Sequence, residues 1–304
     1  MAAPRREQVV EIDDRRLKVS NLDKVLYPQT GFSKAEVIDY YVRIAPVLLP
    51  HIGDRGVTLR RFPDGVDGES FFEKRCPSHR PDWVGTFPGP GDRNGTIGYC
   101  ALDSTAALAW SANLAALEIH APMARGRDIE SPTMCIFDLD PGPGTGIPEC
   151  AEVALQIRDV LDSLAGLTCL PKTSGSKGLQ VYVPLNSPHT HDHCSGFAQA
   201  VAQVLERHHP DEVTSVMRKD LRPGKVFIDW SQNSRHKTTV AVYSLRARPR
   251  PTVSTPLTWV EVEDAASGTD LAFEAAEVLV RVDEHGDLFA SALDVVQQLP
   301  APQA

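Results

Sequence analysis

The order of strand-like and helical segments predicts a mixed α+β fold. Residues 33–53 have the apolar spacing of an amphipathic helix, whereas residues 133–142 form an apolar strand that carries two carboxylates. The other segments do not alternate strand and helix regularly, as a doubly wound parallel sheet would require. One large domain or two smaller lobes fits a chain of 304 residues.

The N-terminal part is expected to contain two helices. Ser33 and Glu36 have the spacing of a capping box, which predicts a helix that opens there and is closed by Pro50 and Gly53. An Ala-rich helix is expected within residues 104–117. Gly and Pro in residues 85–96 predict a mobile loop. Strands are expected over residues 16–19, 57–62, 97–101 and 117–121.

The C-terminal part is expected to contain four further helices and four further strands around the acidic strand. Helical spacing of apolar residues predicts helices over residues 147–164 and 193–208, and near 270–280 and 286–298. Strands are expected over residues 167–170, 179–185, 225–230 and 257–262.

Composition limits the class of protein. Hydrophobic residues make up 42% of the chain, yet no apolar run is long enough to cross a bilayer and the first residues lack a signal-peptide core. A cytoplasmic protein is therefore expected. The net charge of −9 argues against indiscriminate polyanion binding by the whole surface, although local basic patches remain possible. The absence of a Cys-x-x-Cys pair favours reduced core thiols at Cys76, Cys100, Cys135, Cys150, Cys169 and Cys194.

The acidic strand is the main candidate for chemistry. Asp138 and Asp140 are two residues apart, which places both carboxylates on one face of a strand. Such like charges repel unless a cation such as Mg²⁺ or Mn²⁺ lies between them. Asp229 ends another strand and could converge on the same pair of metal ions, which would suit nucleotidyl transfer. Alternatively, one Asp caps the following Pro-Gly turn and the other is a solvated strand residue.

Two other segments could bind anions. Residues 173–178 (TSGSKG) join two strands, so they are not a Walker A loop, but their Ser, Lys and backbone N–H groups suit a phosphate. A plain hairpin turn is the alternative. Residues 235–250 carry five basic and no acidic side chains, which suits a triphosphate or a nucleic-acid backbone. A solvated loop is the alternative, and it is favoured for Arg248 and Arg250.

A second basic set lies nearer the N-terminus and is interleaved with aromatic residues. Aromatic rings can stack on bases while the cations contact phosphates. Because neighbouring strand residues point to opposite faces, one ring of Phe71 and Phe72 is expected in the core. The set comprises Lys24, Lys34, Arg60, Arg61, Phe71, Phe72 and Lys74.

The His-rich residues 189–194 are expected to start a helix rather than bind a metal.

Several of these segments, taken in their order along the chain, together resemble the archaeo-eukaryotic primase (primase-polymerase) superfamily. The closest resemblance is to the polymerase domain of bacterial ligase D and its stand-alone relatives. It implies a single two-lobed primase-polymerase domain over residues 1–304, with an N-terminal DNA-binding lobe over about 1–120. The catalytic lobe, about 121–304, would hold an RNA-recognition-motif-like sheet flanked by helices. The matching segments are residues 21–28, 71–74, 137–142, 173–179, 226–233 and 237–246.

The resemblance also implies roles for individual residues. Asp138, Asp140 and Asp229 would be catalytic and bind two Mn²⁺ or Mg²⁺ ions, and Asp229 would help to deprotonate the primer 3′-hydroxyl. Nucleotide-binding residues would be Ser174, Lys177, Gln180, Gln232, Arg246, His120 and Arg60. DNA-binding residues would be Lys24 and Lys34, at a downstream 5′-phosphate, together with Phe71, Phe72 and Lys74. The family usually has His where this chain has the uncharged Gln180, which puts nucleotide affinity or catalytic strength in question.

The implied function is template-directed gap filling or extension of broken DNA ends in repair, by two-metal-ion catalysis and with a preference for ribonucleotides. The expected partners are gapped or broken DNA with a 5′-phosphate, NTP or dNTP, a separate DNA ligase and an end-binding protein. A free-standing, monomeric, nucleoid-associated polymerase is expected, because no ligase or nuclease module is recognisable. Two alternatives stay open: a primase that makes primers de novo, and a weakly catalytic or non-catalytic DNA-end binding module for end joining.

Overall fold

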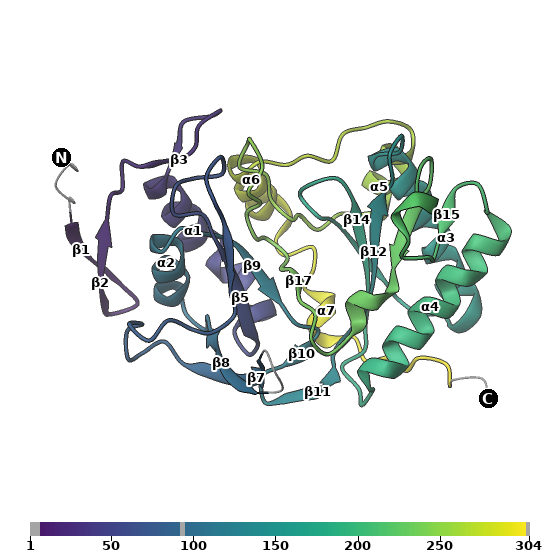
Figure 1. The fold of residues 1–304 in the computed structure, drawn as a ribbon, viewed down its shortest axis with the longest axis horizontal. Helices are drawn as coiled ribbons and strands as arrows, with labels where there is room; N and C mark the ends of the chain where they lie inside the picture. The colour runs from purple at the N-terminus through teal and green to yellow at the C-terminus, as the bar shows by residue number, and fades with distance from the viewer. Residues whose placement is uncertain (1–6, 92–94, 302–304) are drawn as a thin grey trace. The chain divides into compact units, whose positions relative to one another are not determined.

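The computed structural model describes residues 7–91 and 95–301 and divides into two compact units, whose elements are labelled in Figure 1. The first unit comprises Met1–Ala121, Tyr243–Val253 and Phe273–Gly286. The second comprises Pro122–Val242, Ser254–Ala272 and Asp287–Ala304. Two segments from the C-terminal part of the chain therefore pack with the first unit, which the sequence pattern did not indicate.

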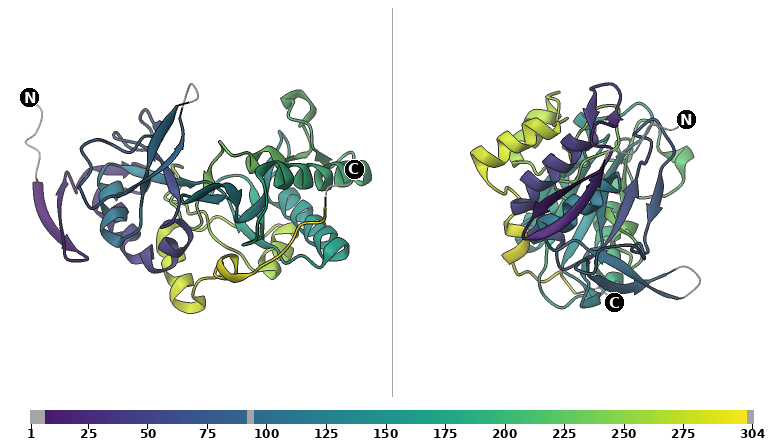
Figure 2. Two further views of the ribbon diagram at one scale, coloured as in Figure 1. Left: turned by 90° about the horizontal axis from the view of Figure 1, so that it is seen from below. Right: turned by 90° about the vertical axis from the view of Figure 1, so that its left-hand side faces the viewer.

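The sheet of the first unit is antiparallel. Its central strand, β5, pairs with β9 along one edge and with β8 and β6 along the other, and β8 pairs with β7. The strands are β5 (Gly56–Arg61), β6 (Phe71–Glu73), β7 (Thr86–Pro90), β8 (Thr96–Ala101) and β9 (Ala116–Ala121). Two short antiparallel pairs complete the strands: β1 (Glu7–Ile12) with β2 (Arg15–Ser20), drawn in purple in Figure 2, and β3 (Val25–Tyr27) with β4 (Phe32–Ser33).

The described residues of the first unit contain three helices: α1 (Lys34–Ile52), α2 (Thr105–Asn113) and α6 (Ala275–His285). The capping box predicted for α1 is confirmed, because the Glu36 carboxylate accepts the Ser33 N–H at 2.7 Å and the Ser33 hydroxyl accepts the Glu36 N–H at 3.4 Å. The prediction that Gly53 closes this helix is confirmed, because Gly53 is its C-cap, whereas the prediction that Pro50 closes it was wrong. Its buried face carries it through Pro50 to Ile52, since tertiary packing outweighs local propensity.

The second unit contains a five-stranded sheet in the order β13-β14-β12-β16-β15. All neighbours are antiparallel except β15 and β16, which are parallel. Helices α3 and α4 lie on the same side of this sheet (Figure 1), which confirms the predicted helix-flanked sheet. The elements are β12 (Met134–Pro141), β13 (Leu170–Thr173), β14 (Leu179–Pro184), β15 (Val213–Thr214), β16 (Val226–Asp229), α3 (Ile147–Ala165) and α4 (His191–His208).

Short elements connect these strands and helices. The strand pair β10 (Ala124–Arg125) and β11 (Asp128–Pro132) precedes β12 in the chain. The 3-10 helices Lys219–Leu221 and Trp230–Asn233 precede and follow β16, and β17 (Thr239–Val240), α5 (Trp259–Ala266) and α7 (Ser291–Asp294) lie further along the chain. Thr190 caps the N-terminus of α4, as expected for the His-rich segment, through a hydrogen bond from the His193 N–H at 3.1 Å.

Three predicted elements need correction. The loop expected at residues 85–96 contains the strand β7, while residues 92–94 lie outside the described residues. Strand β7 tolerates proline because it lies at the edge of its sheet. The strand expected at residues 257–262 was wrong, because Thr258 and Glu261 form a capping box that starts α5. The strand expected at residues 167–170 begins only at Leu170.

The prediction of six reduced cysteines was also wrong. Cys76 and Cys100 form a disulfide, whereas the other four cysteines are free and buried. The two residues are 24 positions apart, but the Cys76 N–H donates to the Gly98 carbonyl at 2.8 Å. The chain that follows β6 therefore runs beside β8, a proximity that cysteine spacing alone does not reveal.

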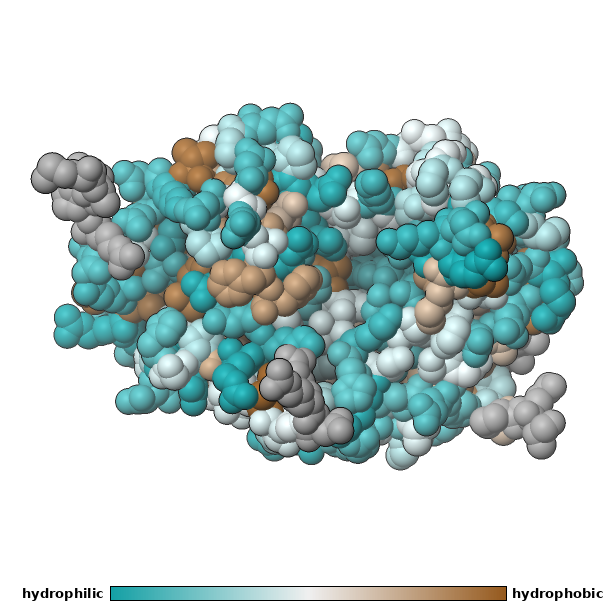
Figure 3. All heavy atoms as spheres, viewed as in Figure 1, coloured by the Kyte–Doolittle hydropathy of each residue, from teal (hydrophilic) through white to brown (hydrophobic). Residues whose placement is uncertain are grey.

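The surface agrees with the composition. The face drawn in Figure 3 is mainly hydrophilic, and its hydrophobic residues occur in separate patches. Within the described part of the chain, no helix is both long and apolar enough to cross a membrane.

Candidate metal and nucleotide site

Strand β12 separates its apolar and acidic side chains onto two faces. Phe137 is fully buried and meets Phe197 of α4 edge to face, with ring centroids 6.4 Å apart. Leu139 is also fully buried, and its carbonyl accepts a hydrogen bond from the Cys150 thiol of α3. Alternation along the strand then places Asp138 and Asp140 on the opposite face. The helices thus fix the strand by one face and leave the carboxylates on the other.

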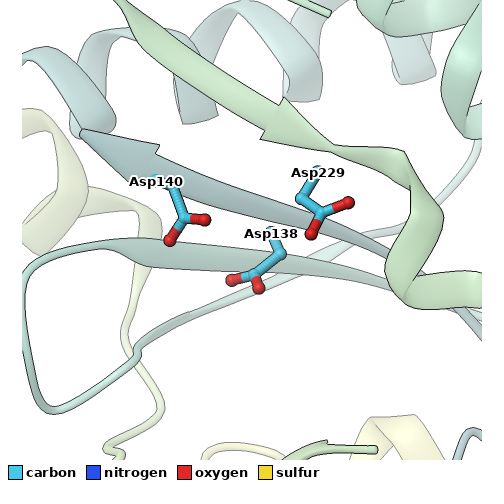
Figure 4. Close-up of side chains that lie close together, drawn as sticks. All are labelled: Asp138, Asp140 and Asp229. Carbon is cyan, nitrogen blue, oxygen red and sulfur yellow. The ribbon is translucent and has the colours of Figure 1, made fainter. Parts of the chain in front are cut away.

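The neighbouring strand contributes the third carboxylate. The antiparallel register of β12 and β16 places Asp229 directly opposite Asp138. Side chains of directly opposed residues project on the same side of a sheet. Figure 4 shows all three carboxylates pointing toward one another, and one oxygen from each lies within 4.8 Å of the others. The structure therefore brings together Asp138, Asp140 and Asp229.

These carboxylates repel one another. Burial raises the pKa of Asp138 to about 7, and the neighbouring charge of Asp140 acts in the same direction, against a hydrogen bond from Gln180. Burial and the charge of Asp229 likewise raise the pKa of Asp140. An all-oxygen set of three carboxylates suits a hard divalent cation, which would relieve this repulsion. The three residues therefore fit Mg²⁺ or Mn²⁺.

Polar side chains hold Asp229 in place. Its Oδ1 accepts the Ser231 N–H at 3.0 Å, and its Oδ2 accepts a hydrogen bond from Gln232 Nε2 at 3.1 Å. The Lys237 ammonium lies 3.6 Å from the same Oδ2. Gln232, which the resemblance assigned to the nucleotide, therefore contacts an acidic residue of the cluster in this structure.

Gln180 supports Asp138 of the acidic strand in a comparable way. Its Nε2 donates to Asp138 Oδ1 at 2.9 Å, while its Oε1 accepts a hydrogen bond from the buried Lys172. Sequence reasoning missed Lys172. The signal was its place in a strand just before the anion-binding turn, which on pairing with β14 sets it opposite Gln180.

The turn predicted to bind an anion packs directly on the acidic strand. The Ser174 hydroxyl accepts the N–H groups of Ser176 and Gly178 at 3.3 Å each, and the Lys177 side chain is exposed. A Cβ atom at Gly178 would lie 2.0 Å from the Leu139 carbonyl oxygen. Only glycine permits this contact, which places the turn next to the carboxylates within one unit.

A second polar cluster lies in the first unit around Glu118, another residue that sequence reasoning missed. Its carboxylate contacts His120 Nε2 at 2.9 Å, Arg246 Nε at 3.1 Å and an Arg60 guanidinium nitrogen at 3.4 Å. All three partners were predicted to bind the nucleotide. The signal was a lone carboxylate inside the apolar strand 116–121, because a buried charge requires partners.

Opposing effects set the pKa values in this cluster. Burial raises the pKa of Glu118, but the hydrogen bond from His120, the charge of Arg246 and the Ala247 N–H outweigh it and lower the value to about 2. Burial lowers the pKa of His120, and the positive charges of Arg246 and Arg60 act in the same direction. The hydrogen bond with Glu118 and its negative charge raise this pKa, but they do not outweigh the lowering effects. Glu118 is therefore ionised and tethers the surrounding side chains.

The two phenylalanines of β6 are both exposed, at 45% for Phe71 and 55% for Phe72. The expectation that one ring is in the core was wrong, because β6 is a three-residue strand that pairs with β5 off the main path of the sheet and both of its rings are exposed. Arg61 lies over Phe71 and Arg60 over Phe72, each 5.2 Å from the ring centroid. Phe72 also meets His120 edge to face, at 5.4 Å between centroids.

The structure brings Lys24 and Lys34 together through their backbones, since the Lys34 N–H donates to the Lys24 carbonyl at 2.8 Å. The Lys34 side chain is buried and its ammonium donates to the Ser20 carbonyl at 2.7 Å. The Lys24 ammonium contacts Asp64 at 2.8 Å. Lys74, at the end of the same aromatic segment, is exposed.

The fold and the carboxylate cluster together define a primase-polymerase domain. Residues 33–289 match the family model described as LigD, primase-polymerase domain, and the chain belongs to this family. The structure is similar to the polymerase domain of Mycobacterium tuberculosis ligase D in complex with DNA. The TM-score is 0.86 at 43% identity, and the match covers 93% of this chain and 99% of the other.

Two curated relatives show the same relationship. The multifunctional non-homologous end joining protein LigD of Mycolicibacterium smegmatis is 47% identical over 279 residues, which are 90% of this chain and 36% of the relative. The bifunctional non-homologous end joining protein LigD of Bacillus subtilis is 31% identical over 272 residues, or 89% and 43% of the two lengths. The chain thus spans well under half the length of these relatives.

The carboxylate repulsion predicts an unusual effect of Asp138→Asn. Without divalent metal, the variant should be more stable than the wild type by about 1–3 kcal/mol near pH 8, because it removes one repelling charge. Since the folded-state pKa of Asp138 is raised from 3.8 to about 7, the wild type loses this stability as the pH rises through that range. The advantage of the variant should therefore disappear near pH 4.

Urea unfolding in EDTA and in Mn²⁺ measures this effect. Mn²⁺ should stabilise the wild type more than the variant, because only the wild type keeps all three carboxylates. The exposed Asp283→Asn serves as the matched control and should change neither series. A variant less stable than the wild type in EDTA near pH 8 would contradict the repulsion.

Glu118→Gln should change the free energy of unfolding in the opposite direction to Asp138→Asn. Because the folded-state pKa of Glu118 is lowered from 4.5 to about 2, its charge contributes stability above that range that is lost as the pH falls through it. The variant should lose about 3 kcal/mol of unfolding free energy near neutral pH, with a smaller difference near pH 3. Glu263→Gln, at the exposed ion pair with Arg158, is the control and should cost under about 1 kcal/mol. Equal losses in the two variants would refute the tethering role of Glu118.

Proposed function

We propose that the protein is a metal-dependent, template-directed nucleotidyltransferase that fills short gaps and extends broken DNA ends in repair, with a preference for ribonucleotides. The observation that carries this proposal is the cluster of Asp138, Asp140 and Asp229 in a domain of the LigD primase-polymerase family. Relatives named for non-homologous end joining, and a similar polymerase domain solved in complex with DNA, support it.

The acidic cluster is the proposed catalytic centre. Asp138 and Asp140 hold two Mn²⁺ or Mg²⁺ ions, and Asp229 completes the site and helps to deprotonate the primer 3′-hydroxyl. Two such ions would activate the attacking hydroxyl and stabilise the pyrophosphate leaving group. Gln180 and Gln232 keep the orientation of Asp138 and Asp229 through the hydrogen bonds described above.

Separate residues bind the nucleotide in this proposal. Ser174 and Lys177 hold the triphosphate of the NTP or dNTP, because the turn offers a hydroxyl group that can donate a hydrogen bond and an exposed ammonium. Arg60, Arg246 and His120 bind the nucleotide as well, and Glu118 holds all three in a fixed arrangement. Arginines held this way lose less side-chain freedom when they bind a phosphate.

The DNA contacts lie on the first unit. Phe71 and Phe72 offer two exposed rings flanked by arginines, which suits base stacking beside a phosphate backbone, and Lys74 follows them. Lys24 and Lys34 bind the 5′-phosphate on the downstream side of a gap or break. Gap filling leaves a nick, so completing the repair requires a DNA ligase and, at broken ends, an end-binding protein as partners. The protein acts as a monomer at the nucleoid.

A second candidate is a DNA-end binding module with weak or no catalysis. Two observations favour it: the uncharged Gln180 next to Asp138, and the Lys237 ammonium 3.6 Å from Asp229. The Lys237 ammonium offsets part of the negative charge that a cation requires, and Gln180 brings no positive charge to the phosphates of a nucleotide. In this candidate function the DNA-binding residues have the same roles, but no nucleotide is transferred.

Primer extension distinguishes the two candidates. On a gap of a few nucleotides with Mn²⁺, the wild type should extend a labelled primer, and extension should be greater when the downstream strand carries a 5′-phosphate and when ribonucleotides are supplied. Asp138→Asn and Asp140→Asn should each reduce the rate at least about 100-fold, because each removes charge that stabilises the transition state. Asp283→Asn is the matched control.

The outcomes separate clearly. Extension that survives loss of both Asp138 and Asp140 would exclude the acidic cluster as the catalytic centre. Tight, phosphate-dependent binding of gapped DNA without extension would establish the end-binding module instead. Binding that barely changes between low and moderate salt would contradict the phosphate contacts, which release counterions.

Phe72→Ala tests the aromatic contact with DNA. Because the ring is exposed, the variant should keep nearly wild-type stability, while losing base stacking should lower affinity for gapped DNA about 5- to 100-fold. Val280→Ala removes an equally exposed apolar side chain elsewhere in the first unit and is the control. Fluorescence anisotropy with gapped DNA measures both variants, and equal affinities would show that Phe72 does not stack on DNA.

A further inference from the structure

Lys172 is a buried cation in the second unit that the proposed chemistry does not use. Only 1% of the residue is exposed, in the strand β13. Its ammonium donates to the Gln180 side-chain oxygen, to the Ser254 hydroxyl at 2.6 Å and to the Val240 carbonyl at 3.3 Å. Removing an ammonium from water is costly, so retaining it in the interior calls for a physical explanation.

The contact with Gln180 decides which way its amide faces. An ammonium has donors and no acceptor, so it can face only the amide oxygen. The Tyr182 hydroxyl also points its donor at this oxygen, at 3.4 Å. The amide nitrogen is then left to face Asp138, and it donates to Asp138 Oδ1 at 2.9 Å.

The reversed amide is disfavoured at both ends. Its nitrogen would face the Lys172 ammonium, donor against donor, and its oxygen would face the Asp138 carboxylate, acceptor against acceptor. Because Gln180 is itself only 3% exposed, water cannot readily satisfy the mismatched groups. Lys172 therefore fixes a single orientation of the amide, and through it one oxygen of Asp138.

We infer that Lys172 is a positioning residue for the metal site: by orienting the Gln180 amide it holds the Asp138 carboxylate ready for a divalent cation. This inference rests on the metal site of the proposed function. Hydrogen bonds to a metal-binding carboxylate preserve its orientation, and losing such a partner typically weakens metal binding. Lys172 acts on the cation through the Gln180 amide that its ammonium contacts, and it cannot itself be a ligand, because an ammonium has no lone pair.

A purely structural role is the competing explanation. The bonds of Lys172 to Ser254 and Val240 connect β13 to two other segments of the second unit, and losing them would lower stability. A structural role would leave the affinity of the folded protein for metal unchanged. Metal binding in folded variants is therefore the readout that separates the two explanations.

A double-mutant cycle tests the inference directly. The variants are Lys172→Met, which keeps the aliphatic stem and removes the donors, Gln180→Leu, and the two combined. Mn²⁺ binding is measured by electron paramagnetic resonance of the free ion, without DNA or nucleotide. Each single variant should bind Mn²⁺ about 10- to 100-fold more weakly, and the double variant should be no weaker than the weaker single one.

Two results would overturn the inference. One is an Mn²⁺ affinity of folded Lys172→Met or of Gln180→Leu that stays within about twofold of the wild type, instead of the expected weakening of about 10- to 100-fold. The other is multiplication of the two losses in the double variant, which would mean that Lys172 does not act through Gln180. If Lys172→Met does not unfold cooperatively, Lys172→Leu, which also lacks donors, replaces it in the same cycle and the same non-additivity is expected.

Ser254→Ala is the matched control, because it removes another hydrogen bond of the Lys172 ammonium without touching Gln180. It should lower stability and leave Mn²⁺ affinity unchanged; a loss equal to that of Lys172→Met would overturn the inference in favour of packing. Primer extension with the same proteins keeps the proposed function separate. Lys172-dependent Mn²⁺ binding without extension would reject the proposed function alone, and extension with Lys172-independent binding would reject the inference alone.

Discussion

Repulsion among three carboxylates is the constraint on which the second unit depends. Asp138, Asp140 and Asp229 have oxygen atoms within 4.8 Å of one another, so the face that carries them is unfavourable without a cation. The opposite face offsets this cost, since Phe137 and Leu139 are fully buried against helices. A strand with one strongly packed face can keep a strained polar face, a compromise typical of functional sites.

The donors around the carboxylates follow from the same constraint. Gln180 and Gln232 each donate one hydrogen bond to an aspartate. A lysine is near each contact: Lys172 donates to the Gln180 oxygen, and the Lys237 ammonium lies near Asp229. In the first unit the signs are reversed, because the single carboxylate of Glu118 collects two arginines and a histidine. Each unit thus contains a charge cluster in which the minority charge stabilises the others, and in the second unit this cluster is only partly buried.

Much of this could be predicted from the sequence. Period-two alternation identified β12 and β16, and the two-residue spacing placed Asp138 and Asp140 on one face. Lys172 and Glu118 were missed because their roles depend on which strands pair, and pairing is a tertiary property. The Cys76–Cys100 disulfide was missed for the same reason. The strand expected at residues 257–262 failed because the capping box at Thr258 competes with an apolar run that also fits a strand.

The contact of Gly178 with the acidic strand limits how this domain can be altered. Gly142 is confined in the same way, because a Cβ atom there would lie 1.9 Å from the Arg222 carbonyl oxygen. Neither position leaves room even for alanine, so Gly178 holds the turn 173–178 against β12 and Gly142 holds the end of this strand against the chain at Arg222. Substitutions meant to alter the turn are therefore better placed at Ser176 and Lys177 than at the two glycines.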